Sequence, residues 1–147
     1  MKIKKLNKKE LEKFIHNIDN EIIIRYGKNF ECDVNKKIVW VGLNQSIGDD
    51  LTFTNFLQTI DKNYYNLFII SLLHEIGHLQ TYTLQLDNER TELYSLQSLA
   101  LQMGIINRQQ ANFEYFNIPM ERKATDWARH YYNLCKPAIA ETINKIF

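Results

Sequence analysis

The sequence predicts an α+β fold, in which a small antiparallel sheet near the N-terminus packs on a mainly helical body. β-Branched and aromatic residues gather in short runs between residues 21 and 43, whereas apolar residues recur at helical spacing along most of the remaining chain. Only five glycines and two prolines occur among the 147 residues, which favours long helices with few tight turns. Strands that are segregated from helices in this way are typical of the α+β class. We expect residues 1–147 to form one domain, because domains most often have about 100–150 residues.

The first expected element is an amphipathic helix from about Lys8 to Asp19. Asn7 and Glu10 have the spacing of a capping box. Apolar residues then recur three or four positions apart, as on one face of a helix: Leu11, Phe14, Ile15 and Ile18.

Three runs then read as strands, Glu21 to Tyr26, Phe30 to Val34 and Ile38 to Leu43. The polar residues 35–37 between the last two runs predict a hairpin. We expect Ile38–Leu43 to be an edge strand, to which an extended peptide can add by main-chain hydrogen bonds. Residues 44–50 are expected to form a loop, and residues 51–60 a short helix.

The rest of the chain is expected to be helical. A long apolar helix is predicted from Tyr64 to about Leu86, followed by a helix from Glu89 to Met103 that Asp87 or Asn88 caps and Gly104 ends. The three remaining helices are expected at Arg108–Tyr115, at Pro119–Leu134 and from Pro137 onward. In the last two, the proline stands in the first helical turn.

Charge and composition exclude several classes of protein. Eighteen Lys and Arg residues nearly balance seventeen Asp and Glu residues, so no strong field attracts nucleic acid or an anionic membrane. The longest apolar run, residues 67–73, is far shorter than the roughly 20 residues of a membrane span. No secretory signal is evident, and Cys32 and Cys135 lack metal-binding spacing, so we expect a cytoplasmic protein with two reduced thiols.

The motif with the clearest chemistry is His74-Glu75-Ile76-Gly77-His78, an instance of HExxH. Positions i and i+4 share one face of a helix, so the imidazoles of His74 and His78 can converge on one Zn²⁺ ion. Glu75 lies on the neighbouring strip, where it can reach a water on the metal and act as general base. The alternative is that the two histidines are core residues hydrogen-bonded to ordinary neighbours.

A catalytic zinc normally has a third protein ligand and an open position for water. Leu84 occupies the place of the third histidine of the metzincin pattern, which excludes that class. The remaining candidates are acidic residues and a histidine further along the chain: Glu89, Glu92, Glu114, Glu121, Asp126, Glu141 and His130. We favour Glu121, because Ala124 and Ala128 share its face and allow its helix to pack closely on the HExxH helix. We expect His130 to be a surface or hydrogen-bonded histidine.

With the later segment Glu121-Arg122-Lys123-Ala124-Thr125-Asp126-Trp127-Ala128, the HEIGH motif resembles the gluzincin-type metallopeptidases, most closely the small ImmA/IrrE-type proteins. The resemblance covers two short motifs and the order of elements over about residues 8–135. It implies a zincin-like fold, His74, His78 and Glu121 as zinc ligands, and Glu75 as general base. It also implies a protein substrate, such as a transcriptional repressor of a mobile element. The family usually has Asp or Asn four residues after the ligand Glu, where this chain has Thr125.

The sequence therefore predicts a zinc-dependent metallopeptidase. Tyr82 is a candidate oxyanion donor, although we favour a packing role for this tyrosine. The alternative is a non-catalytic zinc-binding or partner-binding regulatory module that retains the zincin fold. A fourth protein ligand on the metal would favour this module, and an open position would favour the enzyme.

Overall fold

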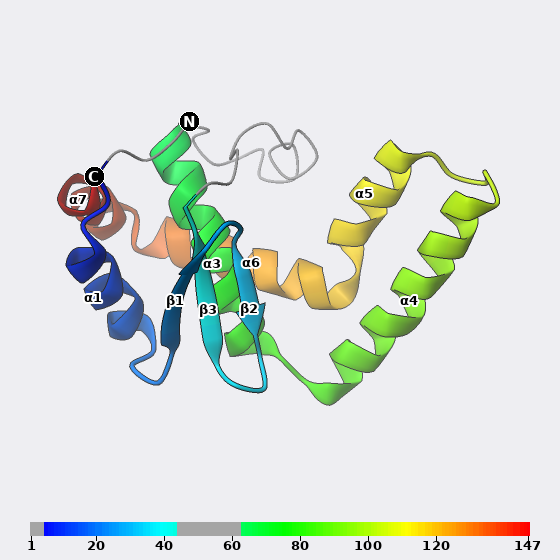
Figure 1. The fold of residues 1–147 in the computed structure, drawn as a ribbon, viewed down its shortest axis with the longest axis horizontal. Coiled ribbons are helices and arrows are strands. Elements are labelled where there is room, and N and C mark those ends of the chain that lie inside the picture. The colour runs from blue at the N-terminus through cyan, green and yellow to red at the C-terminus, as the bar shows by residue number, and fades with distance from the viewer. Residues whose placement is uncertain (1–4, 44–62) are drawn as a thin grey trace.

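Six helices and a three-stranded sheet make up residues 5–43 and 63–147, which the computed structural model describes (Figure 1). The elements in chain order are α1 (Lys8–Ile18), β1 (Ile23–Gly27), β2 (Glu31–Asp33), β3 (Ile38–Gly42), α3 (Tyr64–Thr81), α4 (Leu84–Gln102), α5 (Arg108–Asn117), α6 (Pro119–Leu134) and α7 (Lys136–Ile146). The mixed α+β composition agrees with the sequence-based prediction. The loop and the short helix expected at residues 44–60 lie outside the described residues.

The sheet has the order β1-β3-β2 and is mixed rather than antiparallel. β2 pairs antiparallel with β3 as the hairpin predicts, but β1 pairs parallel with β3, with Ile23 opposite Ile38. The expected antiparallel sheet is therefore wrong for one of its two pairs. The expected edge position of residues 38–43 is also wrong, because β3 is the central strand and β1 and β2 are the edges.

This strand order depends on a close approach at Gly42, the last residue of β3. A Cβ atom at Gly42 would lie only 2.6 Å from the backbone nitrogen of Phe30, in the segment between β1 and β2. The chain can therefore cross the end of β3 immediately after β1 and return along its other side as β2. Because a side chain at position 42 would block this path, glycine permits the crossing.

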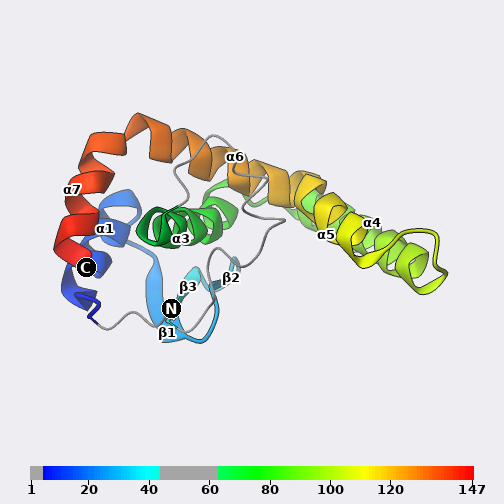
Figure 2. The same cartoon turned by 90° about the horizontal axis from the view of Figure 1, so that it is seen from above.

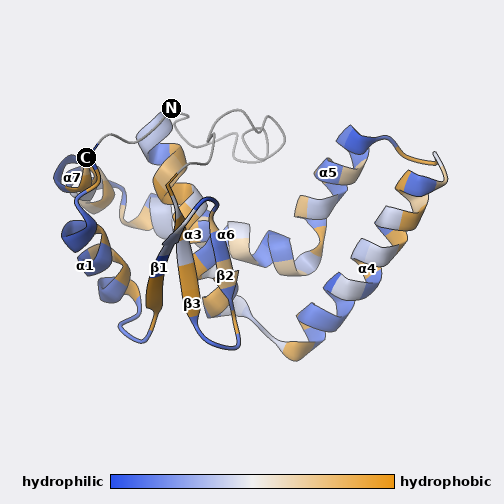
Figure 3. Cartoon of the chain, viewed as in Figure 1, coloured by the Kyte–Doolittle hydropathy of each residue, from blue (hydrophilic) through white to orange (hydrophobic). Residues whose placement is uncertain are grey.

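Helix α3 forms the centre of the body, with the sheet on one side and α6 on the other (Figure 2). Its central residues are buried on all sides, as expected for a helix that is apolar around its whole circumference. The largest buried cluster combines residues of α3 with apolar residues of the sheet, α1, α6 and α7 (Figure 3): Leu11, Ile15, Val39, Val41, Phe68, Leu72, Ala128 and Ile139 are among its members. None of the helices in the described ranges has the length and apolar character needed to cross a membrane.

The HExxH helix ends earlier than the sequence suggests. α3 stops at Thr81, Tyr82 and Thr83 are extended, and the hydroxyl of Thr83 accepts a hydrogen bond from the backbone of Leu86 (3.2 Å). Thr83 therefore caps α4, where Asp87 or Asn88 was expected, and α4 begins at Leu84. A threonine side chain that accepts from the third residue after it is a frequent helix start.

The predicted ends of the later helices agree better with the structure. Gly104 has a positive φ of 72° after α4, and the hydrogen bonds of residues 104 and 105 to carbonyl groups of the last turn form a Schellman motif. α6 has the predicted bounds with Pro119 in its first turn, whereas α5 extends two residues further and α7 begins one residue earlier than expected. α4 and α5 lie side by side and project from the body as a hairpin (Figures 1 and 2).

The base of this α4–α5 hairpin (residues 84–117) has a small core of its own. Leu86, Ile118 and Met120 are buried together, and Tyr82 and Tyr115 pack against them. This cluster joins the hairpin to the start of α6, the helix that carries Glu121.

Candidate metal centre

Three side chains that the sequence singles out converge between α3 and α6. Nε2 of His74 lies 3.1 Å from Oε2 of Glu121, and Nε2 of His78 lies 2.9 Å from the same oxygen. One ligand atom from each of the three residues lies within 4.8 Å of the other two, and all three residues are buried. The imidazole rings thus face a common point, as the i, i+4 spacing predicts.

Close packing of α6 on α3 brings Glu121 to the histidines. A Cβ atom at Gly77 would lie 2.5 Å from the carbonyl oxygen of Ala124, so the backbone of α6 occupies the space that a side chain at position 77 would need. Ala124 and Ala128 are fully buried in this contact region. The small residues on the Glu121 face therefore have the role that the sequence suggested.

Two further residues hold the ligands in place, and sequence reasoning did not identify them. Oγ1 of Thr125 lies 2.9 Å from Nδ1 of His74, which leaves Nε2 of that ring directed at Glu121. The hydroxyl of Tyr115 donates a 2.7 Å hydrogen bond to Oε1 of Glu121, so Oε2 remains for the histidines. Such outer partners fix the orientation of metal ligands in many proteins. Thr125 follows Glu121 by four residues, so the sequence alone indicates that both side chains lie on the same face of α6.

Arg90 of α4 completes this arrangement. Its Nη2 donates to the hydroxyl of Tyr115 at 3.4 Å, and its Nε lies 3.6 Å from Oε1 of Glu121. The three residues Arg90, Tyr115 and Glu121 come from three different helices. The carboxylate of Glu121 is therefore held from both sides, by the histidines at one oxygen and by the hairpin at the other.

The electrostatics of the group favour an ionised carboxylate. Burial alone would raise the pKa of Glu121, but the hydrogen bonds with His74 and His78 outweigh it and hold this pKa well below its usual range. Burial would lower the pKa of His74, but the hydrogen bond to Glu121 and the charges of Glu75 and Glu121 raise it. Burial and the nearby charge of Glu121 raise the pKa of Tyr115 to about 12, so its hydroxyl stays a donor at neutral pH.

Glu75 lies outside this cluster and faces the sheet. Its side chain is half-buried, and it interacts with the thiol of Cys32 on the edge strand β2. Burial raises the pKa of Cys32, and the negative charge of Glu75 raises it further. The carboxylate of Glu75 thus lies between α3 and the edge strand β2.

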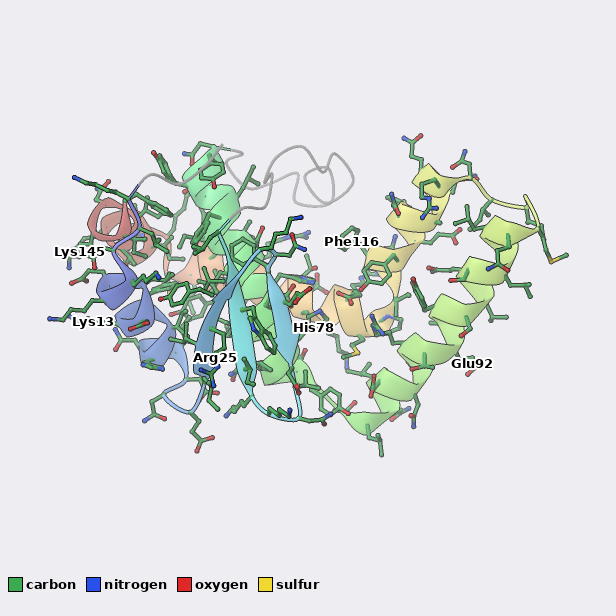
Figure 4. The ribbon with its side chains drawn as sticks, in the orientation of Figure 1. Lys13, Arg25, His78, Glu92, Phe116 and Lys145 are labelled. Carbon is green, nitrogen blue, oxygen red and sulfur yellow. The ribbon has the colours of Figure 1, made fainter. Side chains whose placement is uncertain are left out.

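The other candidate ligands do not join the cluster. His130, Asp126, Glu92, Glu114 and Glu141 are exposed, and only His74, His78 and Glu121 form such a ligand group in the described ranges. Figure 4 shows Glu92 on α4, in the projecting hairpin and away from His78. The hydroxyl of Tyr82 donates to Asp87 at 3.3 Å, an interaction that suits the packing interpretation of this tyrosine.

The donor set fits a divalent metal ion. Two imidazole nitrogens and one carboxylate oxygen are ligands that zinc accepts, and three protein ligands leave a position open. Nδ1 of His78 is buried and has no hydrogen-bond partner among the described residues, so that histidine is not a core residue satisfied on both nitrogens. Two buried imidazoles around one carboxylate are costly without such a cation or a proton between them.

Comparisons with known proteins return no similar protein: no family model matches the chain, and neither a curated protein nor a solved structure does. What can be said of the site therefore comes from its own geometry, a buried His-His-Glu group that could hold a metal ion.

Proposed function

We propose that this protein is a zinc-dependent metallopeptidase with a zincin-like fold of the ImmA/IrrE type, acting on peptide bonds of a protein substrate. The observation that carries the proposal is the buried convergence of His74, His78 and Glu121, with Glu75 one residue from a ligand. A general hydrogen-bonding network would need no HExxH spacing, whereas a gluzincin-type site needs this spacing and a glutamate from another helix.

The residues divide into ligands and a proton carrier. His74, His78 and Glu121 would hold Zn²⁺, which supplies Lewis acidity for the scissile carbonyl when it is bound. Glu75 would accept the proton of the attacking water and later deliver it to the leaving amine. Tyr115 and Thr125 orient Glu121 and His74, respectively.

The substrate would bind along β2 rather than β3. β2 is an edge strand, and its Cys32 interacts with Glu75. An extended peptide that adds to this edge would therefore run past the proton carrier, and its main chain would supply most of the hydrogen bonds.

The non-catalytic regulatory module is the second candidate. A zinc site with only a structural role normally has four protein ligands, and the described ranges offer three. This difference favours the enzyme.

The deciding experiment combines metal analysis with substitution of the proton carrier. Protein purified without a histidine tag should contain about one zinc per chain, and His74→Ala should remove it. Glu75→Gln should retain zinc and lose hydrolysis of a fluorogenic peptide library by at least about a hundredfold. Glu92→Gln is the matched control, because Glu92 is exposed on α4 and should leave both zinc and activity unchanged. Full activity in Glu75→Gln, or a chain without bound metal, would contradict the proposal.

A further inference from the structure

The α4–α5 hairpin contains a groove that the catalytic proposal does not use. The groove encloses about 300 Å³ between the facing sides of the two helices. Arg90 and Leu101 of α4 both line it, and their separation of eleven positions along the helix corresponds to a length of about 16 Å. An extended chain of about five residues has the same length.

The lining of the groove carries positive charge from arginine, part of which Glu121 balances at Arg90 (Nε to Oε1, 3.6 Å). It includes two arginines, Arg90 and Arg108, and no aspartate or glutamate. Uncharged groups that can hydrogen-bond to a peptide lie between them, among them Ser98 and Asn112. A groove with two guanidinium groups and polar walls is suited to carboxylates, which guanidinium binds in a bidentate manner.

Both arginines are placed in ways that favour an anionic ligand. The guanidinium of Arg90 lies 5.9 Å from the ring centroids of both Tyr94 and Tyr115, which restricts its motion. Arg108 is the first residue of α5, where the helix dipole disfavours a positive side chain. A cation kept at this end of a helix adds to the attraction that the backbone already has for an anion.

The groove also leads to the candidate metal centre. Tyr115 lines it and donates to Glu121, and Arg90 contacts both residues. A peptide lying in the groove would therefore have one end beside the residue that orients a ligand of the metal.

We propose that the groove between α4 and α5 binds an acidic segment of the substrate, with Arg108 and Arg90 as its two carboxylate-recognising residues. The identification of the ligand as substrate rests on the proposed peptidase function. A peptide with several carboxylates could contact both arginines along the groove, whereas a free inorganic anion offers only one charged centre. The acidic segment would anchor the substrate at a distance from the scissile bond, so the groove would contribute to specificity. Tyr115 and Arg90, at its base, also contact Glu121.

Direct binding tests the proposal without requiring hydrolysis. The probes are two fluorescently labelled hexapeptides with blocked ends, one with four central glutamates and one with four central glutamines. They are titrated into the protein as purified and into its Glu75→Gln variant, which prevents cleavage. The glutamate peptide should bind about tenfold more tightly than the glutamine peptide.

Substitution of Arg108 locates the binding site. Arg108 is exposed at the surface of the hairpin, so Arg108→Gln should fold and retain zinc while weakening binding of the glutamate peptide by about fivefold or more. The matched control is Arg25→Gln, which removes the same charge from the exposed face of β1 (Figure 4). Equal loss in both variants would assign the effect to net charge and overturn the proposal.

Two other results would also overturn it. These are equal affinity for the two peptides and displacement of the glutamate peptide by millimolar inorganic phosphate, which would identify a site for small anions. Because peptide binding and zinc content are measured separately, a protein that binds the acidic peptide but contains no metal would contradict the proposed function and leave the groove assignment standing.

Discussion

The hydroxyl of Tyr115 donates a 2.7 Å hydrogen bond to one oxygen of Glu121, while the other oxygen of Glu121 faces His74 and His78. Tyr115 belongs to α5 and Glu121 to α6, so this bond connects the projecting hairpin with the candidate metal centre. It leaves the carboxylate with one oxygen directed at the point where the two imidazoles meet.

Tyr115→Phe should weaken zinc binding about tenfold, because Glu121 loses the donor that orients it. The ring remains in place, so the thermal unfolding midpoint of the metal-free protein should change little. The measurement is a competitive zinc titration with a chromophoric chelator. Tyr94→Phe is the matched control, since Tyr94 lies half-exposed on α4 and makes no hydrogen bond to the ligands within the described part of the chain. If both variants bind zinc like the parent protein, Tyr115 does not position Glu121.

Gly77→Ala should destabilise the protein by about 1–3 kcal/mol, because the new methyl group would meet the backbone of Ala124 at 2.5 Å. The sign is informative, since alanine in place of glycine within a helix otherwise stabilises by roughly 1 kcal/mol. The clash would also move α6 away from α3, so zinc affinity should fall together with stability. Urea unfolding and the zinc titration measure the two effects.

The control for this substitution is Gly27→Ala in β1. A Cβ atom there would lie 3.5 Å from the Trp40 side chain, an ordinary contact, so stability should be maintained. A Gly77→Ala variant as stable as the Gly27→Ala variant would contradict the close contact of α3 with α6.

Cys32 should react slowly with iodoacetamide at pH 8, because burial and the charge of Glu75 raise its pKa and keep the thiol protonated. Glu75→Gln removes the charge but not the burial, so the pKa of Cys32 should fall and its alkylation should accelerate several-fold. Mass spectrometry of the labelled peptides measures the rate, with Cys135 as the internal reference. An unchanged rate in Glu75→Gln would show that Glu75 does not face β2.

The convergence of His74, His78 and Glu121 was predictable from the sequence because the spacings behind it are periodic. His74 and His78 are one helical turn apart, and Glu121 shares its face with Ala124 and Ala128. These spacings specify which side chains come together when two helices pack. The small residues indicate which faces of the helices are in contact. The mixed α+β composition was predictable for the same reason, since the helical and strand-like periods occupy separate parts of the chain.

The features that sequence analysis missed depend on tertiary contacts that leave no periodic pattern in the sequence. The order of the strands follows from the passage of the backbone across Gly42, which pairing preferences do not reveal. The end of α3 depends on the Thr83 side chain, whereas apolar Leu84 and Leu86 continue the preceding pattern. Arg90 and Tyr115 reach Glu121 only because the hairpin reverses the chain. They precede Glu121 by 31 and 6 positions, and neither separation predicts a contact.

Because α3 ends at Thr81, the length of the α4–α5 hairpin does not affect the positions of His74 and His78. Both helices of the hairpin leave the body at one base, near Leu86 and Ile118, and the chain turns back at Gly104 far from the ligands. Deleting one turn from each helix near that bend would shorten the projection by about 5 Å and leave the base cluster intact. The length of the projecting hairpin can thus change in whole turns, while the residues that would hold the metal stay in place.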